Sequence, residues 1–293
     1  MLRRTFTALA MGTALIALTA GGAQAQAEKS IKIGWTAWAD AEAVTKLAQR
    51  ILTEKMGYEV ELVMADIGIQ YQGIAQGDLD AMMMSWQPVT HASYLEQLGD
   101  QVDDLGPIYT HAKLGWAVPA YVPEDQVASI EDLAKPEVAE QLGNQIQGID
   151  PGAGLMQASE KAVSNYGLSD YTLVSSSEAA MLAELDRAER GEEWIVATLW
   201  NPHWIFSKYD LRYLEDPKGD LGGSETVNVL ARQELVQDQP EAYDFFSRFF
   251  IELSDLEAMM FEAQNTSYDE AVTKYIDEHP AQVNYWVTGE IAG

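Results

Sequence analysis

Strand-like apolar runs alternate with amphipathic helical patterns along most of this chain, and no other feature limits the fold as strongly. Residues 31–35, 60–65 and 81–86 have the short apolar runs of buried strands. Residues 40–56 and 69–75 lie between them and carry apolar side chains at helical spacing. Parallel strands need crossover helices of this kind, so the pattern predicts an α/β unit built around a parallel sheet.

A second unit of the same kind is expected further along the chain. Its strands are predicted at residues 145–149, 172–174 and 194–199, with helices at 154–166 and 177–190. Two such units predict a two-lobed molecule with a hinged cleft between the lobes.

Two crossings are expected to join the units. Residues 112–122 contain Pro119 and precede Pro123, so they predict a crossover instead of a central strand. Residues 226–231 could return the chain to the first unit, and 241–293 is expected to be helical. The chain is therefore divided into a leader (1–25), a first lobe (26–115), a second lobe (116–219) and a return segment with C-terminal helices (220–293).

The first 25 residues have the pattern of a cleavable secretory signal. Arg3 and Arg4 precede the apolar stretch 8–20, and residues 23–25 (AQA) form a small-x-small cleavage site. The chain has no cysteine, which excludes disulfides, thiol catalysis and a lipid anchor on an N-terminal cysteine. A free periplasmic protein of a double-membraned bacterium is predicted.

The chain is strongly acidic, with a formal net charge of −28. Such a field repels nucleic acid and anionic membranes, so neither is expected as a partner. The acidic residues are spread along the chain, which indicates a solvated surface instead of one binding patch.

Three tryptophans, Trp38, Trp86 and Trp200, each stand at or just after the carboxyl end of a predicted strand. In an open α/β sheet this edge is where ligands bind. Several indole faces suit a cation that cannot donate hydrogen bonds, such as a quaternary ammonium. The alternative is that they are core residues, as most tryptophans are. A ligand that touches all three would bridge the two units and drive closure of the cleft.

Residues 148–155 (GIDPGAGL) lie between a predicted strand and a predicted helix. Gly152 and Gly154 let the backbone approach a ligand, and the amides of Gly154 and Leu155 would open the helix. Such a helix start can hold a carboxylate, although a simple tight turn is the alternative. A dinucleotide-binding loop is not indicated, because Gln157 stands where that motif needs glycine.

His91 follows Trp86 by five residues and is expected on the first turn of a helix opened by Pro88. It could donate a hydrogen bond to an anionic ligand group, or be a capping or surface histidine. His203 could orient the Trp200 loop. The four histidines lack metal-ligand spacing and no GxSxG motif is present, so no metal, cofactor or catalytic residue is expected.

Several longer motifs resemble one known family. In the first lobe they are GDLD (77–80), SWQPVTH (85–91) and AKLGWAVP (112–119). In the second they are GIDPGAG (148–154), SSEAAM (176–181), WNPHW (200–204) and YLEDPKG (213–219). With these motifs the chain resembles the substrate-binding proteins of ABC transporters that import glycine betaine and related quaternary amines. The resemblance extends over nearly all of the chain after the leader.

This resemblance implies a two-lobed α/β periplasmic binding protein fold of the type II-like form, with the ligand cleft between the lobes. The trimethylammonium group would lie in a cage of Trp38, Trp86 and Trp200. The ligand carboxylate would be held by the amides of Gly154 and Leu155 and by the side chain of His91. Supporting positions around these groups would be Trp35, Thr90, Ala153 and His203.

The chain also departs from parts of the family pattern. Some relatives have an aromatic residue where this chain has Ala153, so Trp38 must complete the cage, and Trp35 could exchange roles with it. Choline-preferring relatives have an aspartate two places after the Gly-Trp of the first strand, where this chain has Ala37. A tyrosine common before the crossover is Leu114 here. Both differences argue against choline.

The sequence therefore predicts a periplasmic, monomeric binding protein that delivers glycine betaine to an inner-membrane ABC permease and catalyses no reaction. Rival ligands on the same fold are choline, carnitine, trimethylamine N-oxide, dimethylsulfoniopropionate and ectoine. A secreted α/β hydrolase would be a different class of protein. It is disfavoured because no nucleophile–base pair stands at a strand end.

Overall fold

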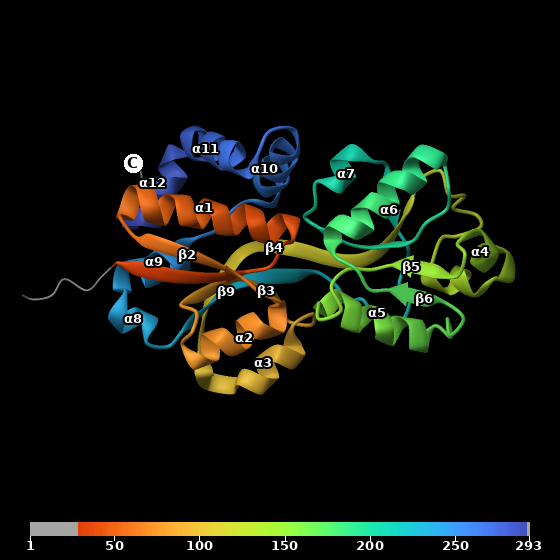
Figure 1. Ribbon diagram of the computed structural model, residues 1–293, viewed down its shortest axis with the longest axis horizontal. Coiled ribbons are helices and arrows are strands. Elements are labelled where there is room, and N and C mark those ends of the chain that lie inside the picture. Colours follow the sequence, from red (N-terminus) through yellow and green to blue (C-terminus); the bar gives the residue numbers. More distant parts are fainter. Residues whose placement is uncertain (1–28, 292–293) are drawn as a thin grey trace, which may run out of the picture.

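The structure is a computed structural model that describes residues 29–291. The expected leader, 1–25, lies outside the described residues. Figure 1 shows two α/β lobes side by side, joined by the long strand β4 (Val102–Pro119) and by the segment that leads into β9 (Glu225–Arg232). The expected two-lobed α/β architecture is confirmed.

The first lobe combines the beginning and the end of the chain. Its strands are β1 (Ser30–Trp35), β2 (Glu59–Met64), β3 (Ala81–Gln87), the first part of β4, and β9. Its helices are α1 (Ala39–Met56), α2 (Ile67–Gln76), α3 (Ala92–Leu98), α8 (Leu235–Asp238), α9 (Pro240–Arg248), α10 (Leu253–Asn265), α11 (Tyr268–Glu278) and α12 (Pro280–Thr288), with a short 3-10 turn η1 (Gly99–Gln101). The predicted strands and the first two predicted helices of this unit are present with shifts of at most two residues at their ends, whereas the helix expected from Pro88 begins at Ala92.

The second lobe is built from the middle of the chain. Its strands are the last part of β4, β5 (Gln145–Gln147), β6 (Thr172–Val174), β7 (Ala197–Asn201) and β8 (Leu211–Tyr213). Its helices are η2 (Ile130–Ala134), α4 (Pro136–Gln141), α5 (Gly154–Asn165), α6 (Glu178–Gly191) and α7 (Ile205–Lys208). Ser177 caps α6, because its side chain accepts a hydrogen bond from the Ala180 amide.

The strands of both lobes form one nine-stranded sheet. Its order is β2-β1-β3-β9-β4-β7-β5-β6, and β8 pairs with β4 outside this order. Strand β1 is parallel to β2 and β3, and β5 is parallel to β6 and β7. The two central strands, β9 and β4, are antiparallel to their neighbours. The expectation of parallel sheets therefore holds at both outer ends and is wrong at the centre.

The expectation that residues 112–122 are a crossover instead of a central strand is also wrong. Residues 112–119 belong to β4, whose first part pairs with β9 and whose second part pairs with β7. Pro119 is tolerated because it is the last residue of the strand, opposite Leu211 of the short strand β8. The chain thus passes from one lobe to the other within a single strand.

Each lobe has its own packed interior. A cluster that lies wholly in the second lobe includes Trp116, Ile146 and Val196, all 0% exposed. A larger cluster fills the first lobe and continues into the residues beside the cleft. Within residues 29–291, no helix is both long enough and apolar enough to cross a bilayer.

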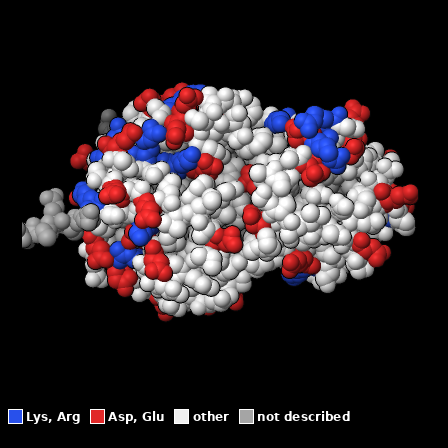
Figure 2. All heavy atoms as spheres, viewed as in Figure 1, with Lys and Arg blue, Asp and Glu red and all other residues white. Residues whose placement is uncertain are grey.

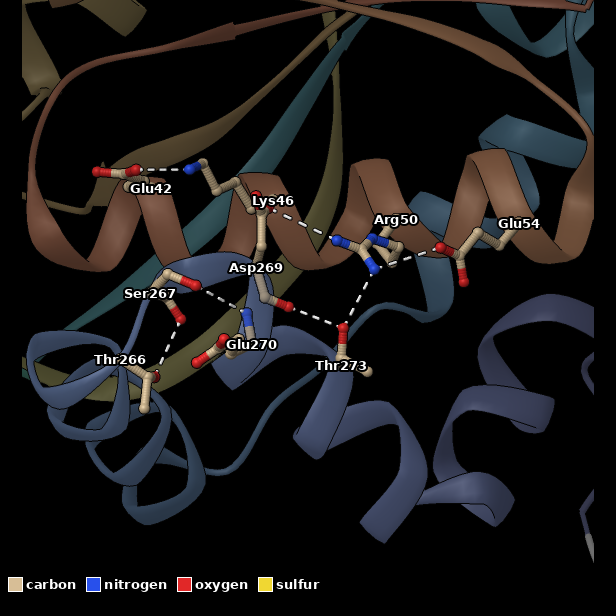
Figure 3. A network of polar contacts seen from close by, with 9 residues as sticks. All are labelled: Glu42, Lys46, Arg50, Glu54, Thr266, Ser267, Asp269, Glu270 and Thr273. Atoms are coloured by element: carbon tan, nitrogen blue, oxygen red, sulfur yellow. Dashed lines mark hydrogen bonds and ion pairs between the residues drawn. The ribbon is translucent and has the colours of Figure 1, made fainter.

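Polar contacts join α11 to α1 within the first lobe. Arg50 of α1 donates a hydrogen bond to Thr273 Oγ1 of α11 at 3.1 Å and lies 3.6 Å from Asp269 (Figure 3).

On the face shown in Figure 2, acidic side chains are scattered over both lobes among Lys and Arg. This distribution agrees with a solvated acidic surface.

Candidate ligand-binding site

A small pocket lies where the two lobes meet, and its empty space, open solvent included, is about 290 Å³. Small-molecule sites occur preferentially at such junctions between domains. The first lobe and β4 supply Trp38, Asp40, Trp86, Thr90, His91 and Leu114. The second lobe supplies Ile149, Ala153, Gly154, Leu155 and Trp200. All six residues that the sequence indicated for ligand binding line this one cavity.

The three tryptophans come from three different elements. Trp86 is in β3, Trp200 is in β7, and Trp38 caps the start of α1, three residues after β1 ends. They are 6% exposed or less, and the ring centroids of Trp38 and Trp200 are 6.4 Å apart, at 58° between planes. The indole N–H of Trp38 donates to Asp150 Oδ2 at 3.0 Å. These rings can therefore present their faces to a cation from both lobes.

Hydrogen-bond donors occupy another part of the cavity wall, at the start of α5. Gly154 and Leu155 are the first two residues of this helix. Their amides have no carbonyl partner within the helix, and the helix start carries a partial positive charge. An anionic ligand group would find two backbone donors here. Ala153, the residue before the helix, also lines the cavity.

His91 lies beside these amides and is 1% exposed. Its Nδ1 accepts a hydrogen bond from the Trp86 amide at 3.1 Å, so the proton of the neutral ring is on Nε2. Burial lowers the pKa of His91 to about 3, so the ring is neutral at neutral pH. His91 can therefore donate one hydrogen bond without adding a charge.

The expectation that His91 lies on the first turn of a helix opened by Pro88 is wrong. Residues 88–91 form a turn, and α3 begins at Ala92. The physical reason is Glu225 of β9, whose Oε2 accepts hydrogen bonds from the amides of Val89 and Thr90. Its other oxygen accepts a hydrogen bond from the Thr90 hydroxyl. This buried carboxylate thereby shapes the turn that presents His91.

Of the four positions expected to support the site, two line the cavity and two do not. Thr90 and Ala153 line the cavity, whereas Trp35 and His203 are not among its lining residues in the described chain. Trp35 is half-buried at the end of β1. His203 packs edge-on against Trp200 with ring centroids 4.8 Å apart. His203 therefore contacts the Trp200 ring without lining the cavity.

The sequence interpretation missed Asp40, Leu114 and Ile149 as lining residues, and Asp40 is the important omission. Asp40 is 0% exposed, and its Oδ2 accepts a hydrogen bond from Tyr109 at 2.6 Å. Its Oδ1 has no hydrogen-bond partner among the described residues. Burial is the main cause that raises the pKa of Asp40 to about 6. A signal did exist, since Asp40 follows Trp38 by two residues, but an acid in the first turn of a helix is ordinary.

No group of three or more His, Cys, Asp or Glu side chains suitable for a metal ion occurs in residues 29–291. The cavity instead combines aromatic faces, backbone donors and one buried carboxylate. Two lobes that share such a small-molecule cavity define a substrate-binding protein of the kind that serves solute importers.

The chain belongs to the family of substrate binding domains of ABC-type glycine betaine transport systems, whose model matches residues 29–278. Members of this family are binding domains of transporters and not enzymes. The predicted class of protein is therefore confirmed.

Individual relatives agree with this assignment. The chain is 38% identical over 159 residues to the glycine betaine/carnitine transport binding protein GbuC of Listeria monocytogenes, which covers 53% of this chain and 53% of that protein. The chain thus spans about half the length of that relative. It is similar to the crystal structure of lactococcal OpuAC, complexed with glycine betaine in its closed-liganded conformation. The TM-score is 0.82 at 38% identity, over 89% of this chain and 100% of that one.

A second solved structure is the glycine betaine, L-proline ABC transporter binding protein (ProX) of Borrelia burgdorferi. It has a TM-score of 0.83 at 36% identity and covers 88% of this chain and 97% of that one. The similarity therefore extends through both lobes.

Proposed function

We propose that this protein binds glycine betaine in the periplasm and delivers it to the permease of an inner-membrane ABC transporter. The family, the two-lobed fold and the secretory pattern of residues 1–25 support this role. We expect the protein to act as a monomer, with one ligand in the cleft.

One observation carries the choice of ligand: the cavity has aromatic walls together with donors for an anion. Trp38, Trp86 and Trp200 offer ring faces to a cation that cannot donate hydrogen bonds, each contact contributing on the order of 2 kcal/mol once desolvated. The amides of Gly154 and Leu155, together with His91, offer hydrogen bonds that offset the lost hydration of a carboxylate. Glycine betaine has both groups within one small molecule.

Glycine betaine should raise the melting temperature of the protein and change its tryptophan fluorescence, whereas glycine should do neither. Glycine has the same carboxylate, but its ammonium group would lose hydrogen-bond partners between indole walls. At a hundred times its dissociation constant, a ligand adds about 2.7 kcal/mol to the free energy of unfolding. A thermal-shift series with both compounds measures this. Equal shifts would contradict the cage.

Choline is a second candidate ligand, and Asp40 is the observation that favours it. Choline has the same trimethylammonium group but ends in a hydroxyl, so it carries a net positive charge. The position compared with choline-preferring relatives, Ala37, is exposed and does not line the cavity, whereas Asp40 is one of its lining residues. When ionised, Asp40 would stabilise a cation more than a zwitterion.

The preference between the two ligands should therefore depend on pH. Below about pH 6 Asp40 is protonated in the free protein, and glycine betaine should bind at least about tenfold more tightly than choline, a difference of about 1.4 kcal/mol. A bound cation favours the ionised carboxyl, so the affinity for choline should rise as the pH is raised through 6. Calorimetric titration at pH 5 and pH 8 checks this.

Two variants separate the contribution of Asp40 to ligand preference from that of His91. Asp40→Asn should remove most of the pH dependence, and His91→Ala should weaken glycine betaine more than choline because only glycine betaine has a carboxylate. The other titratable groups that act on Asp40 are Tyr109, Glu178 and His203, and they remain in both variants. Tighter binding of choline at pH 5 would replace glycine betaine by choline as the proposed ligand.

A further inference from the structure

Two adjacent residues at the start of α1, Trp38 and Ala39, are hydrogen-bonded to two carboxylates of the opposite lobe. The Trp38 indole N–H donates to Asp150 Oδ2 at 3.0 Å. The Ala39 amide donates to Glu178 Oε2 at 3.0 Å. Asp150 belongs to the turn before α5, and Glu178 is the first residue of α6. Two separate elements of the second lobe thus hold one dipeptide of the first.

The Ala39–Glu178 hydrogen bond is buried when the lobes are together, and the Trp38–Asp150 hydrogen bond is partly buried. Trp38, Ala39 and Glu178 are only 5–6% exposed. The Ala39 amide is among the first N–H groups of α1, which have no carbonyl partner within the helix and carry partial positive charge. Hydrogen bonds to a carboxylate are roughly twice as strong as neutral ones. Separation of the lobes would break both.

Glu178 is itself fixed by a contact beside the cage. The Ile205 amide donates to His203 Nδ1 at 3.0 Å, so the proton of a neutral His203 is on Nε2. That nitrogen lies 3.2 Å from Glu178 Oε1, and the His203 ring packs against Trp200. A continuous series of contacts therefore connects Trp200, in the second lobe, with the backbone beside Trp38 in the first.

We propose that Asp150 and Glu178 are positioning residues that clasp the Trp38–Ala39 dipeptide on closure and thereby set the Trp38 ring in the cage. Neither carboxylate is among the described residues that line the cavity, so both act through the dipeptide. The cage wall supplied by the first lobe is thus completed only when the second lobe arrives. This inference rests on the proposed function, because it concerns retention of the same ligand.

A double-mutant cycle with Trp38→Phe tests the Asp150 half of the clasp. Trp38→Phe keeps an aromatic ring but removes the indole N–H. Asp150→Ala alone should raise the dissociation rate of glycine betaine about tenfold and change the association rate by less than about threefold. In the Trp38→Phe background, Asp150→Ala should change the dissociation rate by less than about twofold, because the hydrogen bond is already absent. Stopped-flow tryptophan fluorescence gives both rates.

Three further variants make the test specific. Asp150→Asn retains an oxygen acceptor and should restore most of the slow dissociation. Glu178→Ala should raise the dissociation rate in both backgrounds, because its hydrogen bond goes to the Ala39 amide and not to the indole. Asp170→Ala removes the same charge from an exposed site of the second lobe and should have no effect.

The outcomes are distinguishable. If Asp150→Ala has the same effect with and without the indole N–H, the clasp is wrong and the proposed function stands. If the wild-type protein responds to neither glycine betaine nor choline, both are wrong. Thermal unfolding of each ligand-free variant identifies any that fails to fold. Should Asp150→Ala fail to fold, Asp150→Leu, which also lacks an oxygen acceptor, decides by the same comparison in the two backgrounds.

Discussion

Replacing Trp286 by alanine should destabilise the protein by about 3–5 kcal/mol, as truncation of a large buried aromatic residue usually does. Trp286 of α12 is 0% exposed, and its ring lies 4.5 Å from that of Phe249, centroid to centroid. Its indole nitrogen has no hydrogen-bond partner in the described part of the chain, so the loss is one of packing alone. Urea unfolding of the ligand-free variant measures it.

The cage tryptophans supply the contrast to Trp286. Trp38→Ala, Trp86→Ala and Trp200→Ala should each weaken glycine betaine binding by about 1–3 kcal/mol with the fold retained. Trp286→Ala should leave the affinity of the folded fraction nearly unchanged, because its side chain does not line the cavity. A larger loss of binding for Trp286→Ala than for Trp200→Ala, at equal folded fraction, would place the site elsewhere.

The elements of both lobes could be predicted because hydrophobic periodicity is a local property. The pairing of the central strands β4 and β9 could not be predicted from such local patterns. Strand β4 is 18 residues long, and its two parts pair with β9 and β7, whose paired residues lie 80 or more positions further along the sequence. No local pattern states which strands will be neighbours. The proline at the end of β4 therefore suggested a crossover where the tertiary structure has a central strand.

The tryptophans of the site could be predicted because ligands of α/β proteins bind at the carboxyl ends of strands. Strand ends meet at one edge of a sheet, so tryptophans placed there from three strands converge. The choice between Trp35 and Trp38 was open in the sequence, and the structure settles which ring lines the cavity. Asp40 could not be recognised, because an acid in the first turn of a helix is usually explained by the helix dipole. That Asp40 lines the cavity follows only from the tertiary structure, in which the two lobes meet beside it.

Close approach of the lobes explains why glycine is needed at the start of α5. A Cβ atom at residue 154 would lie 2.5 Å from the Thr90 carbonyl oxygen and 2.9 Å from His91 Cδ2. The carbonyl belongs to the backbone of the turn held by Glu225, so it cannot rotate away as a side chain could. The contact exists only when the second lobe meets the first.

Gly154→Ala should therefore weaken glycine betaine binding at least about a hundredfold, roughly 2.7 kcal/mol, because it obstructs closure. It should not destabilise the second lobe, since alanine is the better helix former and Gly154 is the first residue of a helix. Gly152→Ala is the matched control in the same turn, where an added Cβ meets nothing within 4 Å. Calorimetric titration gives the affinities, and small-angle scattering with and without ligand reports closure. If Gly154→Ala binds and closes like the wild type, the ligand is held without this approach of the lobes, and the amides at the start of α5 lose their assigned role.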